Sequence, residues 1–201
     1  TLMLGPIDTL LDEKGHALDE TERRQLQMAK RSAKRLTQLV DQLHDLAKVE
    51  TGTMSVEAER ANVASFVAEC VTSFSNLARQ RRITLSFENN LDDPVFTFDD
   101  SKVEKIISNL LTNAFEATED GGTVDVTLRK AKLYDDPETA PCIAIIVKDD
   151  GVGIPEDKQS HLRRHFNEDT GAWTLGDSRL GIGLNLVHEL AHLHRHQPVR
   201  L

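Results

Sequence analysis

Residues 101–128 read SKVEKIISNLLTNAFEATEDGGTVDVTL and contain three successive patterns that decide the fold. Between Ser101 and Thr118 apolar residues recur every three or four positions, which predicts an amphipathic helix. The run EDGG at residues 119–122 ends this helix. Residues 123–128 have high β-propensity and predict a strand. The segment therefore indicates a fold that mixes helices and strands.

The predicted helix carries a polar stripe beside its apolar face. Asn109, Asn113 and Glu116 are spaced i, i+4 and i+7, which places them on one side of the helix. The apolar face consists of Val103, Ile106, Ile107, Leu110, Ala114 and Ala117. Asn side-chain carbonyls suit Mg²⁺, and their amide N–H groups can donate to phosphate. Taken alone, however, the stripe is more typical of plain solvated surface.

Two glycine-containing segments follow this helix. Asp149 lies directly after a predicted strand, where its carboxylate can accept a hydrogen bond from the exocyclic amine of adenine. Gly151 and Gly153 would let the backbone approach the base closely. Further along, residues 180–184 (LGIGL) open a predicted helix, whose N-terminal N–H groups are a ready site for phosphate. Each segment by itself is a common turn or loop–helix junction.

The remaining patterns complete one domain, which we expect to span residues 56–201 with an incomplete C-terminal hairpin. Its mixture of predicted helices and strands indicates an α+β fold: an α/β sandwich with helices on one face of a mixed, mostly antiparallel sheet. The other predicted elements are helices at residues 62–80 and 183–194, strands at residues 83–87, 95–98 and 143–147, and a long loop at residues 150–180.

Residues 1–55 predict a helical hairpin ahead of this domain. Residues 1–12 are compatible with a first helix, and Asp19 or Thr21 can cap a second helix that runs to about Val49. The second helix carries a narrow apolar seam with heptad spacing, which suits an antiparallel bundle. A two-helix hairpin cannot bury this seam alone, so we expect a four-helix homodimer; the alternative is that the hairpin docks on its own domain. The seam consists of Leu26, Ala29, Ala33, Leu36, Val40, Leu43 and Ala47.

Composition narrows the range of partners. The chain has 201 residues and a net charge of −9, which argues against a nucleic-acid partner. Cys70 and Cys142 lie in apolar runs and predict buried, reduced thiols. No apolar stretch is long enough to span a bilayer, so we expect no direct membrane contact from this segment. Thr1 is not a natural start, and we expect a cytoplasmic piece of a longer protein, which could be a membrane receptor.

The order and spacing of these motifs resemble the GHKL ATPase superfamily, and in detail the sensor histidine kinases. Residues 108–114 (SNLLTNA), followed by EDGG, are similar to the asparagine box of that family. Residues 149–154 resemble its first glycine box and residues 181–184 its second. Residues 1–6 (TLMLGP) are similar to the stretch that follows the phosphoacceptor box. The phosphoacceptor His is therefore expected about two helical turns upstream of Thr1.

The resemblance implies a mechanism and its cofactors. The protein would bind ATP and Mg²⁺ and transfer the γ-phosphoryl group to a His, and then to an Asp on the receiver domain of a response regulator. Asp149 would hold the adenine, and Asn109 and Asn113 would handle Mg²⁺ and the phosphates. A mobile lid would lie between the glycine boxes. The other expected ATP-binding residues are Glu116, Gly151, Gly153, Ile154, Phe166, Gly181, Gly183 and Leu184.

Departures from the family pattern keep two other functions open. Glu116 stands where the family usually has Lys, and Arg179 and Leu180 stand where the second glycine box usually has Gly and then Thr or Ser. These residues would fit a non-catalytic dimerising module with a degenerate nucleotide site. Residues 188–192 (HELAH) match the zinc-protease pattern HExxH. No third ligand follows at the expected spacing, and the resemblance assigns this run to an outer helix face after the second glycine box, so a zinc hydrolase is the weakest reading.

Overall fold

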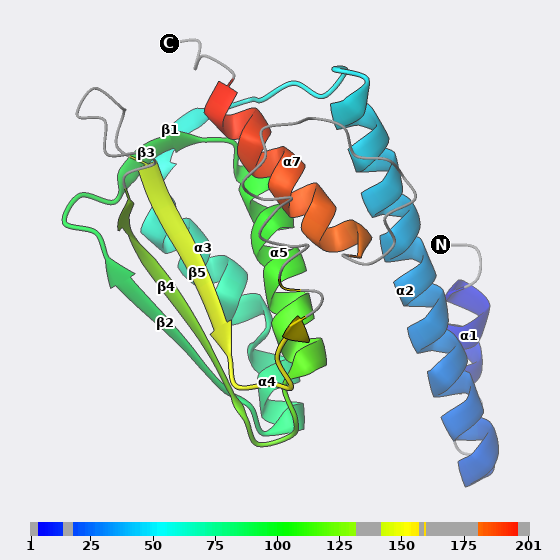
Figure 1. The fold of residues 1–201 in the computed structure, drawn as a ribbon. Helices are drawn as coiled ribbons and strands as arrows, with labels where there is room; N and C mark the ends of the chain where they lie inside the picture. Colours follow the sequence, from blue (N-terminus) through cyan, green and yellow to red (C-terminus); the bar gives the residue numbers. More distant parts are fainter. Residues whose placement is uncertain (1–3, 14–17, 132–141, 157–158, 160–180, 197–201) are drawn as a thin grey trace.

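The computed structural model describes residues 4–13, 18–131, 142–156, 159 and 181–196 (Figure 1). None of the helices in these ranges combines the length and apolar content needed to cross a membrane. The elements, in chain order, are α1 (Leu4–Glu13), α2 (Glu20–Glu50), β1 (Glu59–Asn62), α3 (Val63–Ser73), α4 (Ser75–Arg81), β2 (Thr84–Asn90), β3 (Val95–Phe98), α5 (Asp100–Ala117), β4 (Thr123–Ala131), β5 (Cys142–Asp149) and α7 (Ile182–His196).

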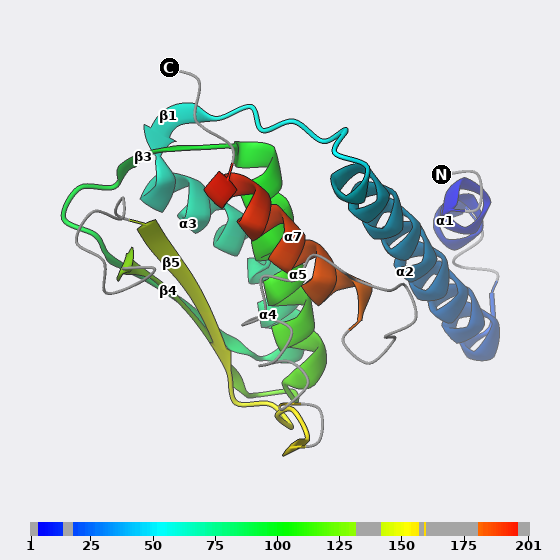
Figure 2. The ribbon, with the colours of Figure 1, turned by 45° about the horizontal axis from the view of Figure 1, so that its top comes forward.

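The larger part of the structure is a sandwich of helices on one face of a sheet, as the sequence predicts. Figure 2 shows α3, α5 and α7 on the same side of the strands. The three-stranded sheet has the order β2-β4-β5. β2 pairs with β4 in parallel, and β4 pairs with β5 antiparallel. The parallel pair is possible because α5 lies between β2 and β4 in the chain and provides the crossover. The sheet is therefore mixed.

The structure corrects one local prediction and adds one strand. The single helix predicted at residues 62–80 is broken at Phe74 into α3 and α4. Ser73 Oγ donates to the Cys70 carbonyl at 2.7 Å, a local hydrogen bond that competes with the helix, and the Phe74 ring lies 5.6 Å from the Phe115 ring in the core. Strand β1 was not predicted because all four of its residues are exposed and show no alternation. It exists through antiparallel pairing with β3.

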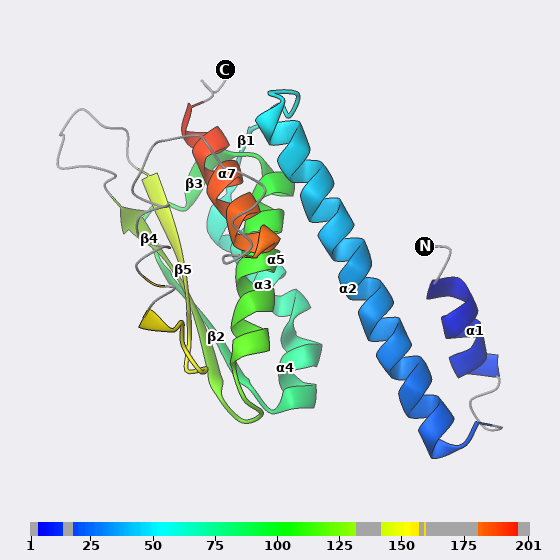
Figure 3. The same ribbon diagram turned by 45° about the vertical axis from the view of Figure 1, so that its right-hand side comes forward.

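The hairpin has the predicted form. Asp19 caps α2: its carboxylate accepts from the Glu22 N–H at 2.8 Å, and the Glu22 carboxylate accepts from the Asp19 N–H at 2.9 Å. This reciprocal capping box explains why the helix begins there. α1 lies beside the N-terminal part of α2, and Figure 3 shows the remainder of α2 extending along the sandwich. Asp8 of α1 pairs with Lys30 of α2 at 2.5 Å.

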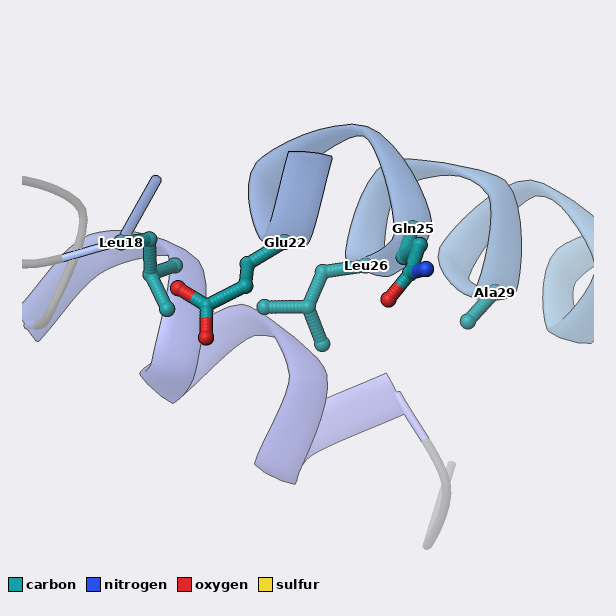
Figure 4. A pocket seen from close by; sticks show the side chains of 5 residues that line it. All are labelled: Leu18, Glu22, Gln25, Leu26 and Ala29. Atoms are coloured by element: carbon teal, nitrogen blue, oxygen red, sulfur yellow. The ribbon is translucent and has the colours of Figure 1, made fainter. Parts of the chain in front are cut away.

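The apolar seam of α2 is largely open in the single chain. Leu36 is 55% exposed and Val40 is 57% exposed, values that are high for large apolar side chains on one stripe. A shallow pocket of about 370 Å³ lies at the N-terminal turns of α2, on the side that faces α1 (Figure 4). It is lined by Leu18, Glu22, Gln25, Leu26 and Ala29. The hairpin alone thus leaves its apolar surface incompletely buried.

The linker after the hairpin is fixed by Asp99, the N-cap residue of α5, which is only 1% exposed. Its carboxylate accepts hydrogen bonds from the Glu57 N–H and the Lys102 ammonium, both at 2.7 Å, and from the Ser101 hydroxyl at 2.7 Å. The Asp99 N–H donates to His194 Nε2 of α7 at 3.3 Å. The Asp99 side chain therefore joins the segment between α2 and β1, at Glu57, to the first turn of α5. The Asp99 backbone N–H adds a contact with α7.

Burial alone would raise the pKa of the Asp99 carboxyl, but the hydrogen bonds from Lys102, Glu57 and Ser101 outweigh it and hold the pKa at about 2. The unfolded value is about 3.9. The carboxylate therefore contributes its full stabilisation above about pH 4 and loses it as the pH falls toward about 2.

We expect Asp99→Asn to lower the free energy of unfolding by about 2–4 kcal/mol at neutral pH, because the Lys102 ammonium loses its buried counter-charge. The difference from the wild-type protein should narrow as the pH falls from about 4 toward 2. Urea denaturation across this pH range measures both effects. Asp92→Asn, the same change at a side chain that is 99% exposed, serves as control. A difference that does not depend on pH would contradict the role of the Asp99 charge.

Candidate nucleotide-binding site

Helix α5 presents the predicted polar stripe on the side away from the core. Asn109 is half-buried, and Asn113 and Glu116 are exposed. The buried face differs slightly from the predicted one, because Leu111 and Phe115 are buried whereas Ile106, Leu110 and Ala117 are half-buried. The buried residues of α5 are Val103, Ile107, Leu111, Ala114 and Phe115. The packing of this face on the sheet orients the stripe.

The first glycine segment lies against the C-terminal end of α5. The Val152 N–H donates to the Ala117 carbonyl at 3.3 Å. A Cβ atom on Gly151 would collide with the same carbonyl, so only glycine fits this approach. The Asp149 carboxylate accepts from the Gly151 N–H at 3.0 Å, which holds Asp149 beside the turn. The turn and the polar helix are thus joined through backbone contacts.

Asp150 ties this turn to the start of β4, a role that the sequence analysis missed. Its carboxylate accepts from the Thr123 N–H at 2.8 Å, and its own N–H donates to the Thr123 carbonyl at 3.2 Å. The hydrogen bond from the Thr123 N–H lowers the pKa of the Asp150 carboxyl, and burial acts in the opposite direction. The only signal in the sequence was a second acidic residue after the strand, which does not reveal its partner.

The second glycine segment meets the asparagine stripe directly. Gly183, in the first turn of α7, lies so close to α5 that a Cβ atom would be 2.9 Å from Asn109 Oδ1. α7 lies against α5 (Figure 1). Its Leu186 and Leu190 side chains are buried. The asparagine stripe at Asn109 and the second glycine segment at Gly183 are therefore in contact, although they lie 74 residues apart in the sequence.

Of the other predicted site residues, Gly153, Ile154, Gly181 and Leu184 lie in the part of the chain that the structure describes. Gly153 and Gly181 both adopt positive φ angles. Ile154 is 48% exposed beside the first glycine turn, and Leu184 is half-buried in α7. Phe166, Arg179, Leu180 and nearly all of the predicted lid lie outside the described residues.

Helix α2 also reaches the polar stripe, which sequence patterns did not reveal. Gln42 Nε2 donates to Asn109 Oδ1 at 2.5 Å, and Asn109 Nδ2 donates to the Lys105 carbonyl at 2.7 Å. Arg35 lies 3.8 Å from the Glu116 carboxylate. One face of the hairpin thus docks on its own domain, while the heptad seam occupies another face of α2.

The HELAH run lies within α7. The rings of His188 and His192 are stacked with centroids 6.3 Å apart, and Glu189 lies 3.5 Å from His188 Nδ1. His188 is not on the outer face as predicted, since its side chain is only 20% exposed. His194 accepts from Asp99. Across the residues that the structure describes, no group of three or more potential ligands is arranged to hold a metal ion.

Sequence comparisons agree with this arrangement. The family described as "His Kinase A (phospho-acceptor) domain" matches residues 1–52. The family described as "Histidine kinase-, DNA gyrase B-, and HSP90-like ATPase" matches residues 98–200. The chain belongs to the sensor histidine kinases. The HELAH run is accordingly part of a helix in a histidine kinase domain, and the zinc-hydrolase reading is set aside.

Curated relatives are histidine kinases of greater length. Hybrid signal transduction histidine kinase D of Dictyostelium discoideum is 30% identical over 96% of this chain. Histidine kinase P4 of Formosa agariphila is 31% identical over 97%, and the sensor histidine kinase TmoS of Ectopseudomonas mendocina is 30% identical over 96%. This chain spans only 12%, 14% and 19% of the lengths of these three relatives.

Solved histidine kinases share the fold. The kinase AdeS of Acinetobacter baumannii matches with a TM-score of 0.59 and 16% identity, over 96% of this chain and 83% of AdeS. Full-length ShkA in complex with AMPPNP matches with a TM-score of 0.64 and 20% identity, over 95% of this chain and 37% of ShkA. At these identities the likeness concerns the arrangement of helices and strands.

We expect Gly151→Ala to lower the free energy of unfolding of this kinase chain by about 1–3 kcal/mol, because the added methyl group must displace the α5 terminus. Chemical denaturation measures the change. Gly5→Ala is the control, since a Cβ atom there meets nothing within 4 Å. A Gly151→Ala variant as stable as the wild-type protein would show that the turn does not pack on α5 as described.

Proposed function

We propose that this chain is the transmitter core of a sensor histidine kinase that binds Mg²⁺-ATP and transfers the γ-phosphoryl group to a His imidazole, and then to an Asp on a receiver domain. Residues 1–55 form the dimerising part and residues 56–201 the ATP-binding domain. The observation that carries the proposal is the contact between Asn109 and Gly183, which joins the two motifs expected to hold metal and phosphate. Catalysis would consist of positioning and charge neutralisation.

The adenine end of the site is assigned to Asp149 and the glycine turn beside it. Asp149 accepts one hydrogen bond from the Gly151 N–H, and a carboxylate can accept others, including one from the adenine amine. Ile154, exposed next to this turn, offers apolar surface for the base. Phe166 in the lid is assigned to the same nucleotide. ShkA, which shares the fold, was solved in complex with AMPPNP.

The metal and phosphate end is assigned to α5 and the start of α7. Asn109 and Asn113 lie one turn apart and present oxygen donors of the kind that Mg²⁺ takes. Gly181, Gly183 and Leu184 lie at the N-terminus of α7, where free backbone N–H groups favour phosphate. Bound Mg²⁺ would neutralise phosphate charge. Because cellular ATP is the phosphoryl donor, we propose that the chain acts in the cytoplasm.

We expect Asp149→Asn to weaken ATP binding by about tenfold to a hundredfold, because a charge-assisted hydrogen bond to the adenine amine is lost. Isothermal titration calorimetry with Mg²⁺-ATP measures this affinity. Asp92→Asn is the matched control, because Asp92 lies at the opposite end of the sheet from Asp149. The first residues of β2 and β4 lie at the Asp149 end, and Asp92 follows the last residue of β2. Equal affinities for the wild-type protein and Asp149→Asn, with the fold intact, would remove Asp149 from the site. A wild-type chain that binds no ATP would favour the degenerate module.

The open heptad seam supports a homodimer. Its large apolar residues lie on one stripe of α2, away from the face that docks on α5, and the pocket at the base of the hairpin is continuous with it through Leu26. A second copy of the hairpin would bury this stripe in a four-helix bundle. The receiver domain of a response regulator is the partner that the proposed reaction requires.

We expect the wild-type chain to be a dimer and Leu36→Glu or Val40→Glu to be monomeric, because each change would bury an unpaired charge in the bundle. Multi-angle light scattering gives the mass in solution. Gln27→Glu, which adds the same charge at an exposed position off the seam, should remain dimeric. A wild-type monomer at high micromolar concentration would defeat the bundle.

A further inference from the structure

We propose that α2 is an inhibitory latch on the nucleotide site: Gln42 holds the Asn109 oxygen that Mg²⁺ would take, so Mg²⁺-ATP binding and docking of α2 compete. This inference rests on the proposed function, because it assigns Asn109 to the metal. It concerns the described contacts between α2 and α5, which the resemblance to other kinases did not predict.

Three side-chain contacts join the two helices in matched register. Along α2 the contacting residues are Arg35, Gln42 and Asp45, and along α5 their partners run in the reverse order, Glu116, Asn109 and Lys105. The spacings are seven and three residues on α2 and seven and four on α5. Each set therefore lies on one helix face, and the two faces meet antiparallel.

The charges of the two faces are complementary. Arg35 faces Glu116 at one end, and Asp45 faces Lys105 at 2.5 Å at the other. Arg35 and Glu116 are both largely exposed, so this pair adds little by itself. Asp45 is only 13% exposed and lies next to the buried Leu46, so the Lys105 end is the firmer anchor. Glu116, which departs from the family pattern, acquires a partner on α2.

The contact at Asn109 is the one that competes with metal. Its Oδ1 atom receives the Gln42 N–H on one side and faces the Gly183 backbone on the other, where even a Cβ atom would be 2.9 Å away. Mg²⁺ requires near-octahedral coordination and usually retains several waters, which need space around the ligand oxygen. The enclosed oxygen does not offer that space while Gln42 is in place.

The latch and the dimer use different faces of α2. Gln42 contacts α5 and Leu46, four residues further along, is buried, whereas Leu36, Val40 and Leu43 form the exposed seam. Release of the latch therefore does not require separation of the bundle. Linkage then demands reciprocity: whatever moves α2 away from α5 raises Mg²⁺-ATP affinity, and Mg²⁺-ATP binding favours the released position.

The first test compares Gln42→Ala with Gln38→Ala, a control one turn earlier whose side chain is exposed. A fluorescent ATP analogue is titrated with Mg²⁺ and with EDTA. We expect Gln42→Ala to bind the Mg²⁺ complex about twofold to tenfold more tightly than the wild-type chain, the range of one net hydrogen bond. The gain should shrink in EDTA, and Gln38→Ala should match the wild type. Unchanged or weaker Mg²⁺-dependent binding by Gln42→Ala overturns the latch.

The second test uses charge exchange. Asp45→Lys places two cations together and should release α2, raising Mg²⁺-ATP affinity, and Asp45→Lys combined with Lys105→Asp should restore the wild-type value. Asp41→Lys adds the same charge at an exposed side chain one turn away and should change affinity little. An equal gain in Asp41→Lys, or no restoration in the double variant, overturns the proposal.

A readout without nucleotide separates failure of the latch from failure of the proposed function. Small-angle X-ray scattering should show a larger radius of gyration for Asp45→Lys than for the wild-type chain and the double variant. If the radius of gyration changes as expected but no variant binds nucleotide, the proposed function is wrong. The proposed competition between α2 and Mg²⁺-ATP is then wrong as well. If the dimensions are identical in all variants, the docked latch is wrong even where nucleotide binds.

Discussion

The burial of one face of α5 on the sheet is the interaction on which the rest of the structure depends. Ile107, Leu111 and Phe115 are almost wholly inaccessible, so rotation of this helix would expose large apolar surface to water. With that face fixed, Asn109 can point only toward the side where α7 and α2 lie. Asp99 secures the beginning of the same helix, and the Arg81 guanidinium donates to the Phe115 and Thr118 carbonyls at its end.

Around this fixed helix, the candidate site is assembled from close backbone approaches rather than from a preformed cluster of charges. Gly151 admits the Ala117 carbonyl, and Gly183 admits the Asn109 side chain. Both contacts depend on the missing Cβ atom, which lets segments from opposite ends of the domain meet at α5. α2 covers the remaining side of the site through Gln42, so access to Asn109 depends on where that helix lies.

Helix α2 serves two surfaces at once. Its heptad seam is suited to a second hairpin, and its Gln42 face is suited to α5. The Gln42 face of α2 also provides a partner for Glu116, whose charge is unfavourable for phosphate but complementary to Arg35. A residue that looks like decay of the nucleotide site when compared with the family is, in this structure, part of the contact between the two halves of the molecule.

The sequence by itself determined the element types, a cap for the second helix at Asp19 or Thr21, the heptad seam and the family, because periodicity, capping residues and glycine motifs are local signals. It did not reveal β1, the break at Phe74, the role of Asp150 or the Gln42–Asn109 contact. Each of these depends on a partner remote in the chain: β1 exists only beside β3, and Gln42 finds Asn109 67 positions away. Such pairings carry no period, so only the packing of the whole chain decided them.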